Sequence, residues 1–212
     1  MLIRSALAAT AAAALVVVPV TAANAQTWQH VDATHDLVSG TFDMNTEDMP
    51  DFTPDPTQAD PDIKRVKVHY GAHKVTVRTH FRDLTRSQDA MSDYSFLLRT
   101  NEHNARGIDV VAGAGMWKGQ AFMSSRRGEV HCKGLRHHIS YRLHDVVVRV
   151  PRSCLSDPRW VQVAGVSVKA TISDPATDTD GSQATVTMLL DDALSAKADL
   201  NKVNWSPRIH RG

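Results

Sequence analysis

Basic residues alternate with apolar ones between Ile63 and Asp83, and this spacing suits the binding of an anionic ligand. The segment IKRVKVHYGAHKVTVRTHFRD carries apolar residues at every second position on either side of a Gly-Ala turn. A period of two predicts a β-hairpin with one buried and one solvent-facing side. The solvent-facing candidates for ligand binding are Lys67, His69, Arg78 and His80. Such a face suits an acidic cell-wall polymer, although ordinary solvated sheet faces also carry charge.

Three further arginines, Arg99, Arg142 and Arg149, would widen this basic face if they lie on neighbouring strands with the same facing. The whole chain is nevertheless close to neutral, with 24 Lys+Arg against 23 Asp+Glu. A neutral balance argues against nucleic acid as a partner, because nucleic-acid binding usually needs a basic excess. The 11 histidines would add positive charge in acid.

The Gly-rich segment GAGMWKG at residues 113–119 offers a second candidate site, Trp117 with Lys118. Flat exposed aromatic rings stack on sugar faces, and a large ring in such a loop has little reason to be buried. The competing interpretation is a loop anchor that packs on the edge of the domain. Aromatic residues make up only 6% of the chain, which is low for a dedicated glycan binder.

The carboxylates Asp174, Asp178 and Asp180 lie in one short loop and are weak candidates for binding calcium, which prefers oxygen ligands. Their spacing differs from that of an EF-hand loop, and the acidic stretch 55–62 would add ligands only if the two loops meet. No other cofactor is firmly implied. Haem would need a Met/His pair that no spacing singles out, and His137 and His138 would point to opposite faces of a strand.

Catalytic motifs are absent from the sequence: there is no Gly-x-Ser-x-Gly elbow, no His-Glu-x-x-His and no P-loop. A glycosidase-like carboxylate pair can be far apart in sequence, so an unrecognised hydrolase stays an alternative. Glutamate is scarce, with Glu47, Glu102 and Glu129 only. The composition therefore favours a binding protein over an enzyme.

Residues 1–25 are expected to be a cleavable signal peptide. Arg4 precedes an apolar run at 6–20, and Ala23-Asn24-Ala25 provides the small residues that a signal peptidase reads, so cleavage is expected before Gln26. The apolar run is shorter than the ~20 residues of a transmembrane helix. The alternative is an uncleaved anchor; otherwise the protein is secreted and not embedded in a membrane.

Two cysteines, Cys132 and Cys154, are expected to form a disulfide in the oxidising extracellular environment. The bridge would close a loop of about 20 residues and stabilise the fold by roughly 3 kcal/mol on the chain-entropy model. Two buried free thiols are the alternative.

Many short apolar-alternating segments with Gly and Pro turns predict an all-β protein, an antiparallel jelly-roll-like β-sandwich with a single domain. We expect the domain to span 26–192, with an acidic, Pro-rich surface loop at 43–62 and a first strand near 35–42. The tail 193–212 is expected to pack on the domain through Trp205. In the segment 160–172 the apolar phase shifts at Ala164-Gly165, which predicts a bulge or bend.

Several short motifs occur in a characteristic order: Asp62-Ile63, Phe81-Arg82-Asp83-Leu84, Val150-Pro151-Arg152-Ser153-Cys154-Leu155, Pro158-Arg159-Trp160-Val161, Asp191-Asp192-Ala193 and Ser206-Pro207-Arg208-Ile209. In this order the chain resembles uncharacterised secreted proteins of Gram-positive bacteria, over most of residues 36–212. Their sandwich is similar to DOMON-like domains and family-nine carbohydrate-binding modules. The resemblance implies a jelly-roll-like fold, whereas the ligand differs among such folds.

These observations predict a secreted, monomeric, non-catalytic binding domain for extracellular glycan or cell-wall polymer. A structural or protein-interaction sandwich without a small ligand is the principal alternative. An exposed Trp117 beside a groove would favour the first interpretation, and an evenly charged flat surface the second.

Overall fold

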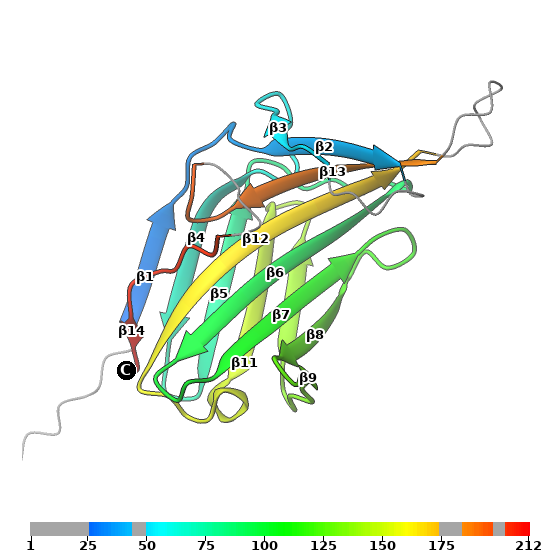
Figure 1. Ribbon diagram of the computed structural model, residues 1–212. Helices are drawn as coiled ribbons and strands as arrows, with labels where there is room; N and C mark the ends of the chain where they lie inside the picture. The colour runs from blue at the N-terminus through cyan, green and yellow to red at the C-terminus, as the bar shows by residue number, and fades with distance from the viewer. Residues whose placement is uncertain (1–25, 44–49, 174–183, 197–201) are drawn as a thin grey trace, which may run out of the picture.

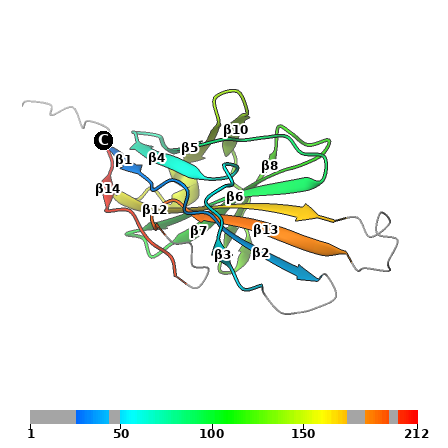
Figure 2. The same cartoon turned by 90° about the horizontal axis from the view of Figure 1, so that it is seen from above.

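Alternating burial along the strands builds two antiparallel sheets that pack face to face (Figure 1). The computed structural model describes residues 26–43, 50–173, 184–196 and 202–212. The two layers are seen edge-on in Figure 2, with β4 and β5 in one and β12 and β13 in the other. This architecture confirms the predicted antiparallel β-sandwich.

The smaller sheet has five strands in the order β1-β4-β5-β11-β10. Their bounds are β1 Gln26–Val31, β4 Ile63–Tyr70, β5 Lys74–Phe81, β10 Arg136–Ser140 and β11 Asp145–Pro151. β4 and β5 form the predicted hairpin, in which Val68 lies opposite Val77. All five strands pair antiparallel with their neighbours.

The larger sheet runs in the order β3-β2-β13-β12-β6-β7-β8-β9, with β14 pairing on β12. Its strands are β2 Val38–Asp43, β3 Thr53–Pro54, β6 Ala90–Thr100, β7 Ala105–Ala112, β8 Gln120–Ser125, β9 Gly128–Glu129, β12 Trp160–Ile172, β13 Thr185–Asp192 and β14 Ile209–His210. A short 3-10 helix, Arg152–Leu155, follows β11. In the described part of the chain, no helix is long and apolar enough to span a membrane.

The main core lies between the sheets and takes one face of each strand. The inward positions of the hairpin, such as Val68, Val75 and Val77, are completely buried. They pack in one cluster with large side chains of the other sheet, including Tyr94 and Ile108. Burial of apolar surface at about 25 cal/mol per Å² is the main force that holds the layers together.

The phase shift in β12 does not mark a bulge, so the first of the two predicted explanations, a bulge or a bend, is wrong. β12 pairs with β6 without a break from Val161 to Thr171. Val161 and Val163 face the main core, whereas Val166 and Val168 pack in a second, smaller apolar cluster that includes Leu190. The apolar pattern therefore changes because the strand contributes to two clusters, one on each face of the sheet.

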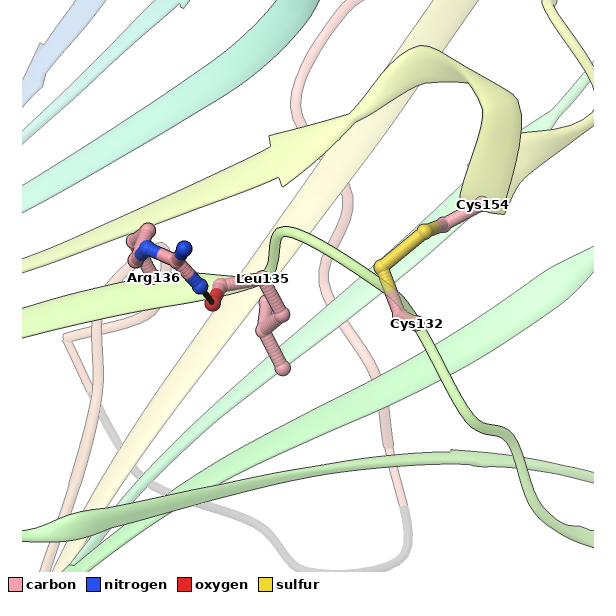
Figure 3. Close-up of a disulfide and its surroundings, with 4 residues drawn as sticks. All are labelled: Cys132, Leu135, Arg136 and Cys154. Carbon is pink, nitrogen blue, oxygen red and sulfur yellow. Dashed lines mark hydrogen bonds between the residues drawn. A yellow bond between two sulfur atoms is a disulfide. The ribbon is translucent and has the colours of Figure 1, made fainter.

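A disulfide joins Cys132 to Cys154, as predicted (Figure 3). Cys132 lies in the segment before β10, and Cys154 lies in the 3-10 helix after β11. The two Cα atoms are 5.6 Å apart and the residues are separated by 22 positions. The bridge thus clasps the edge strand β10 to the end of its neighbour.

The C-terminal residues lie against β12. The backbone N–H of Ser206 donates to the carbonyl of Val163 over 2.9 Å, and the guanidinium of Arg99 lies 4.4 Å from the ring centre of Trp205. β14 then pairs with the first residues of β12.

Candidate functional site

A polar groove of about 480 Å³ crosses the outer face of the smaller sheet. Its lining residues come from β1, β4 and β5 and are Thr27, Gln29, Arg65, Lys67, His69, Thr76, Arg78 and His80. The groove therefore brings together four of the predicted ligand-binding residues. They meet because the even-numbered apolar residues of β4 and the odd-numbered ones of β5 turn into the core, which sends the basic residues between them outward.

The strand register stacks these side chains in cross-strand pairs. Lys67 lies opposite Arg78 and Gln29, and Arg65 lies opposite His80. A fourth pair, Thr27 and His69, is linked by a hydrogen bond of 3.0 Å between Thr27 Oγ1 and His69 Nδ1. Hydroxyl, amide and cationic groups thus alternate across three strands.

Asp145 of β11 holds two of the groove residues in place. Its Oδ2 lies 3.2 Å from Arg78 Nη1, and its Oδ1 lies 3.0 Å from His80 Nδ1. The carboxylate is buried while the Arg78 side chain is 53% exposed, so the cation keeps a large free surface. Among the described residues that line the groove there is no carboxylate.

The basic face continues across the rest of the smaller sheet. Arg149 of β11 lies opposite Thr76 of β5 and opposite Arg136 of β10. Arg149 therefore meets the predicted condition of a neighbouring strand. Arg99 does not, because it belongs to β6 of the other sheet, where it hydrogen-bonds Gln162.

Trp117 and Lys118 lie between β7 and β8 of the larger sheet and do not line the groove. The Trp117 ring is half-buried and meets the ring of Tyr141 edge-on, with centroids 6.4 Å apart. Nε2 of His137 lies 3.0 Å from the carbonyl oxygen of Lys118. These contacts agree with a loop anchored to the β10 side of the molecule.

An acidic centre lies at one end of the sandwich and was not found by sequence reasoning. One oxygen from each of Asp36, Asp62 and Asp191 lies within 4.8 Å of the others. These residues come from the β1–β2 connection, the residue before β4 and the end of β13. They are the one group of metal-ligating side chains that we find within the described residues.

Burial makes ionisation costly in this region. Desolvation, followed by the nearby charges of Asp191 and Asp36, raises the pKa of Asp32 to about 9. Desolvation likewise raises the pKa of Asp191 to about 8, although the hydrogen bond that Asp191 accepts from the Ile63 N–H lowers this pKa. The raised pKa values of Asp32 and Asp191 favour their protonated forms at neutral pH.

The predicted calcium ligands Asp174, Asp178 and Asp180 lie outside the described residues. Of the neighbouring acidic stretch, Asp60 bonds Lys169 Nζ and the Thr85 hydroxyl, whereas Asp62 belongs to the acidic centre. Part of that stretch is therefore buried structure and not a surface loop.

No family model, curated protein or solved structure matches this chain. The similarity to DOMON-like and family-nine carbohydrate-binding domains stays a prediction.

Proposed function

We propose that this protein is an extracellular, non-catalytic binding domain whose cationic groove recognises an anionic glycan or cell-wall polymer. The observation that carries the proposal is the groove itself, in which Arg65, Lys67 and Arg78 stand on adjacent strands with two histidines and uncharged hydrogen-bonding groups. Carboxylate or phosphate groups of a polymer would pair with the cations, and hydroxyl groups with Thr27, Gln29 and Thr76.

The cross-strand pairing supports a charged ligand. Lys67 and Arg78 are direct neighbours across the β4–β5 ladder, as are Arg136 and Arg149 across β10–β11. Like charges directly opposite each other destabilise a sheet. Asp145 offsets part of this repulsion at Arg78, and an anion that binds between the paired cations would relieve the rest, so the arrangement favours the bound state.

The groove suits an extended chain. It spans three strands, which are about 4.8 Å apart, so successive anionic groups of a polymer would meet successive rows of side chains. Because most of these cations are exposed, binding should weaken as salt shortens the Debye length from about 10 Å at 0.1 M ionic strength to about 3 Å at 1 M.

The test is binding of the purified protein to polygalacturonate, to dextran as a neutral polymer and to purified cell walls. We expect retention on the anionic polymer and on cell walls that falls with salt. The double variant Lys67→Gln/Arg78→Gln should bind at least about tenfold more weakly, since both groups contact the polymer in this proposal.

A matched control removes the same charge elsewhere. Arg126 and Arg127 are exposed in the turn between β8 and β9. The variant Arg126→Gln/Arg127→Gln should retain the binding of the wild-type protein. If both double variants bind like wild type, the groove is not the recognition site. If dextran competes as well as polygalacturonate, the ligand is not recognised by its charge. Either result would favour a structural or protein-interaction domain without a small ligand.

A further inference from the structure

The acidic centre is assembled from three distant parts of the chain by specific backbone contacts. Asp191 Oδ2 accepts a hydrogen bond of 2.6 Å from the N–H of Ile63, which is 128 residues away. Asp62 Oδ2 accepts one of 2.8 Å from the N–H of His35, next to Asp36. These bonds fix the carboxylates of Asp62 and Asp191 in position, and the bond to His35 places the neighbouring Asp36 beside them.

Protein groups balance the charges of the centre only in part. Nη1 of Arg82 lies 2.7 Å from Asp62 Oδ2. Among the described residues, this is the one ion pair that any of the three carboxylates makes. When ionised, three carboxylates against one guanidinium leave two negative charges. A divalent cation would neutralise them.

Buried oxygens without partners are the second, independent sign of a ligand. Asp62 and Asp191 are completely buried, yet Oδ1 of each has no hydrogen-bond partner. Both oxygens of Asp36 are buried as well, and neither accepts a hydrogen bond from another described residue. A buried charged oxygen without a hydrogen bond is costly, so buried oxygens of this kind normally have a partner in protein, water or a bound ion.

We propose that Asp36, Asp62 and Asp191 bind a calcium ion. All three offer hard carboxylate oxygens, which calcium, magnesium and manganese prefer and which zinc and copper sites use less. Calcium–oxygen distances of about 2.3–2.6 Å place opposite ligands about 4.6–5.2 Å apart. Three oxygens that lie within 4.8 Å of one another can therefore contact one calcium ion. Calcium is favoured over magnesium because magnesium keeps most of its waters and seldom occupies a buried carboxylate cage.

Asp32 is a further acidic residue near the centre but lies outside the group of three proposed ligands. Its Oδ1 accepts a hydrogen bond of 3.0 Å from the Ala33 N–H, while Oδ2 is buried without a partner. Calcium takes six to eight oxygen ligands, so backbone carbonyls and water would supply the remainder. The bound ion would join the β1–β2 connection, the start of β4 and the end of β13, and thereby fasten the two sheets at this end.

The experiment is a calcium titration of the full mature protein after removal of metals with EGTA. We expect a saturable heat in calorimetry, with a dissociation constant at or below about 1 mM, the range of weak extracellular calcium modules. At a hundredfold excess of calcium over the dissociation constant, the melting temperature should rise by about 5–10 °C. Magnesium at the same concentration should give a smaller rise.

Two variants locate the site. Asp36→Asn removes a carboxylate whose oxygens make no long-range hydrogen bond, so the calcium-free protein should melt at or above the wild-type temperature, while calcium binds at least about tenfold more weakly. Asp191→Asn keeps an acceptor for the Ile63 N–H and should weaken binding similarly. Asp89→Asn, which changes an exposed carboxylate before β6, is the matched control and should bind calcium like wild type.

The proposal is overturned if the wild-type protein shows neither heat nor a shift in melting temperature. It is also overturned if Asp36→Asn and Asp191→Asn bind calcium as tightly as Asp89→Asn, because the ion then lies elsewhere. The polymer assay does not report on this site, so each proposal can fail alone.

Discussion

Asp93 shows how a single ionisable residue couples stability to pH. It lies on the outer face of the larger sheet, where desolvation and the charge of Asp109 raise its pKa to about 6. Ser95 donates a hydrogen bond of 2.7 Å to Asp109 and lies 3.5 Å from Asp93. The folded state therefore holds a proton on Asp93 more tightly than the unfolded state does.

The sign of the pH dependence follows. A carboxyl group whose pKa is raised on folding stabilises the protein below about pH 4 and loses that contribution as pH rises to about 6. We expect Asp93→Asn to raise the free energy of unfolding at pH 7 by about 1 kcal/mol, a modest value because water screens this half-exposed group. Urea denaturation at pH 7 and at pH 4 measures it; an equal gain at both values would contradict the assignment.

Trp117 gives a second prediction for a single residue. Because its ring packs edge-on against Tyr141, Trp117→Ala should lower the free energy of unfolding by about 1–3 kcal/mol. Binding to polygalacturonate should stay within twofold of wild type, since the ring lies outside the groove. Chemical denaturation and the polymer assay on one preparation separate the two effects, and weaker binding at unchanged stability would restore Trp117 as a ligand contact.

Among the elements, the Cys132–Cys154 bridge offers the simplest test. Replacing both cysteines with Ala should lower the free energy of unfolding by about 3 kcal/mol, because the bridge reduces the conformational entropy of the unfolded chain. Intact mass after alkylation under denaturing, non-reducing conditions should show no modified thiol in the wild-type protein. Two alkylated cysteines would refute the bridge.

The hairpin was predictable because its information is local. Alternation of apolar and basic residues places Lys67 and Arg78 on one face, and adjacent strands joined by a tight turn pair in that register. β1 was missed because the segment QTWQHV has few apolar residues, and its burial is partial even in the structure. The pairing of β1 with β4 places Thr27 and Gln29 in the groove. No local sequence pattern predicts this pairing.

The acidic centre was beyond the reach of local patterns. Asp62 and Asp191 are far apart in the chain. They lie close together only because β4 and β13, which belong to different sheets, meet at this end of the sandwich. Single aspartates at strand ends are common turn residues. Only the tertiary arrangement shows that these carboxylates are buried together.

At the scale of the whole molecule, the export signal remains to be tested. If residues 1–25 are removed as predicted, protein expressed with its own leader in a Gram-positive host should be recovered from the medium with Gln26 as its first residue. N-terminal sequencing or intact mass decides this. Recovery of the full-length chain in the membrane fraction would support the uncleaved anchor instead.

The basic face of the smaller sheet has one further consequence. Arg65, Lys67, Arg78, Arg136 and Arg149 share that face, whereas the chain as a whole carries 24 basic and 23 acidic residues. A molecule with little net charge but a one-sided distribution has a permanent electric dipole. Near an anionic surface such a dipole experiences a torque, so under the proposed function the groove would already face an anionic polymer when the protein arrives.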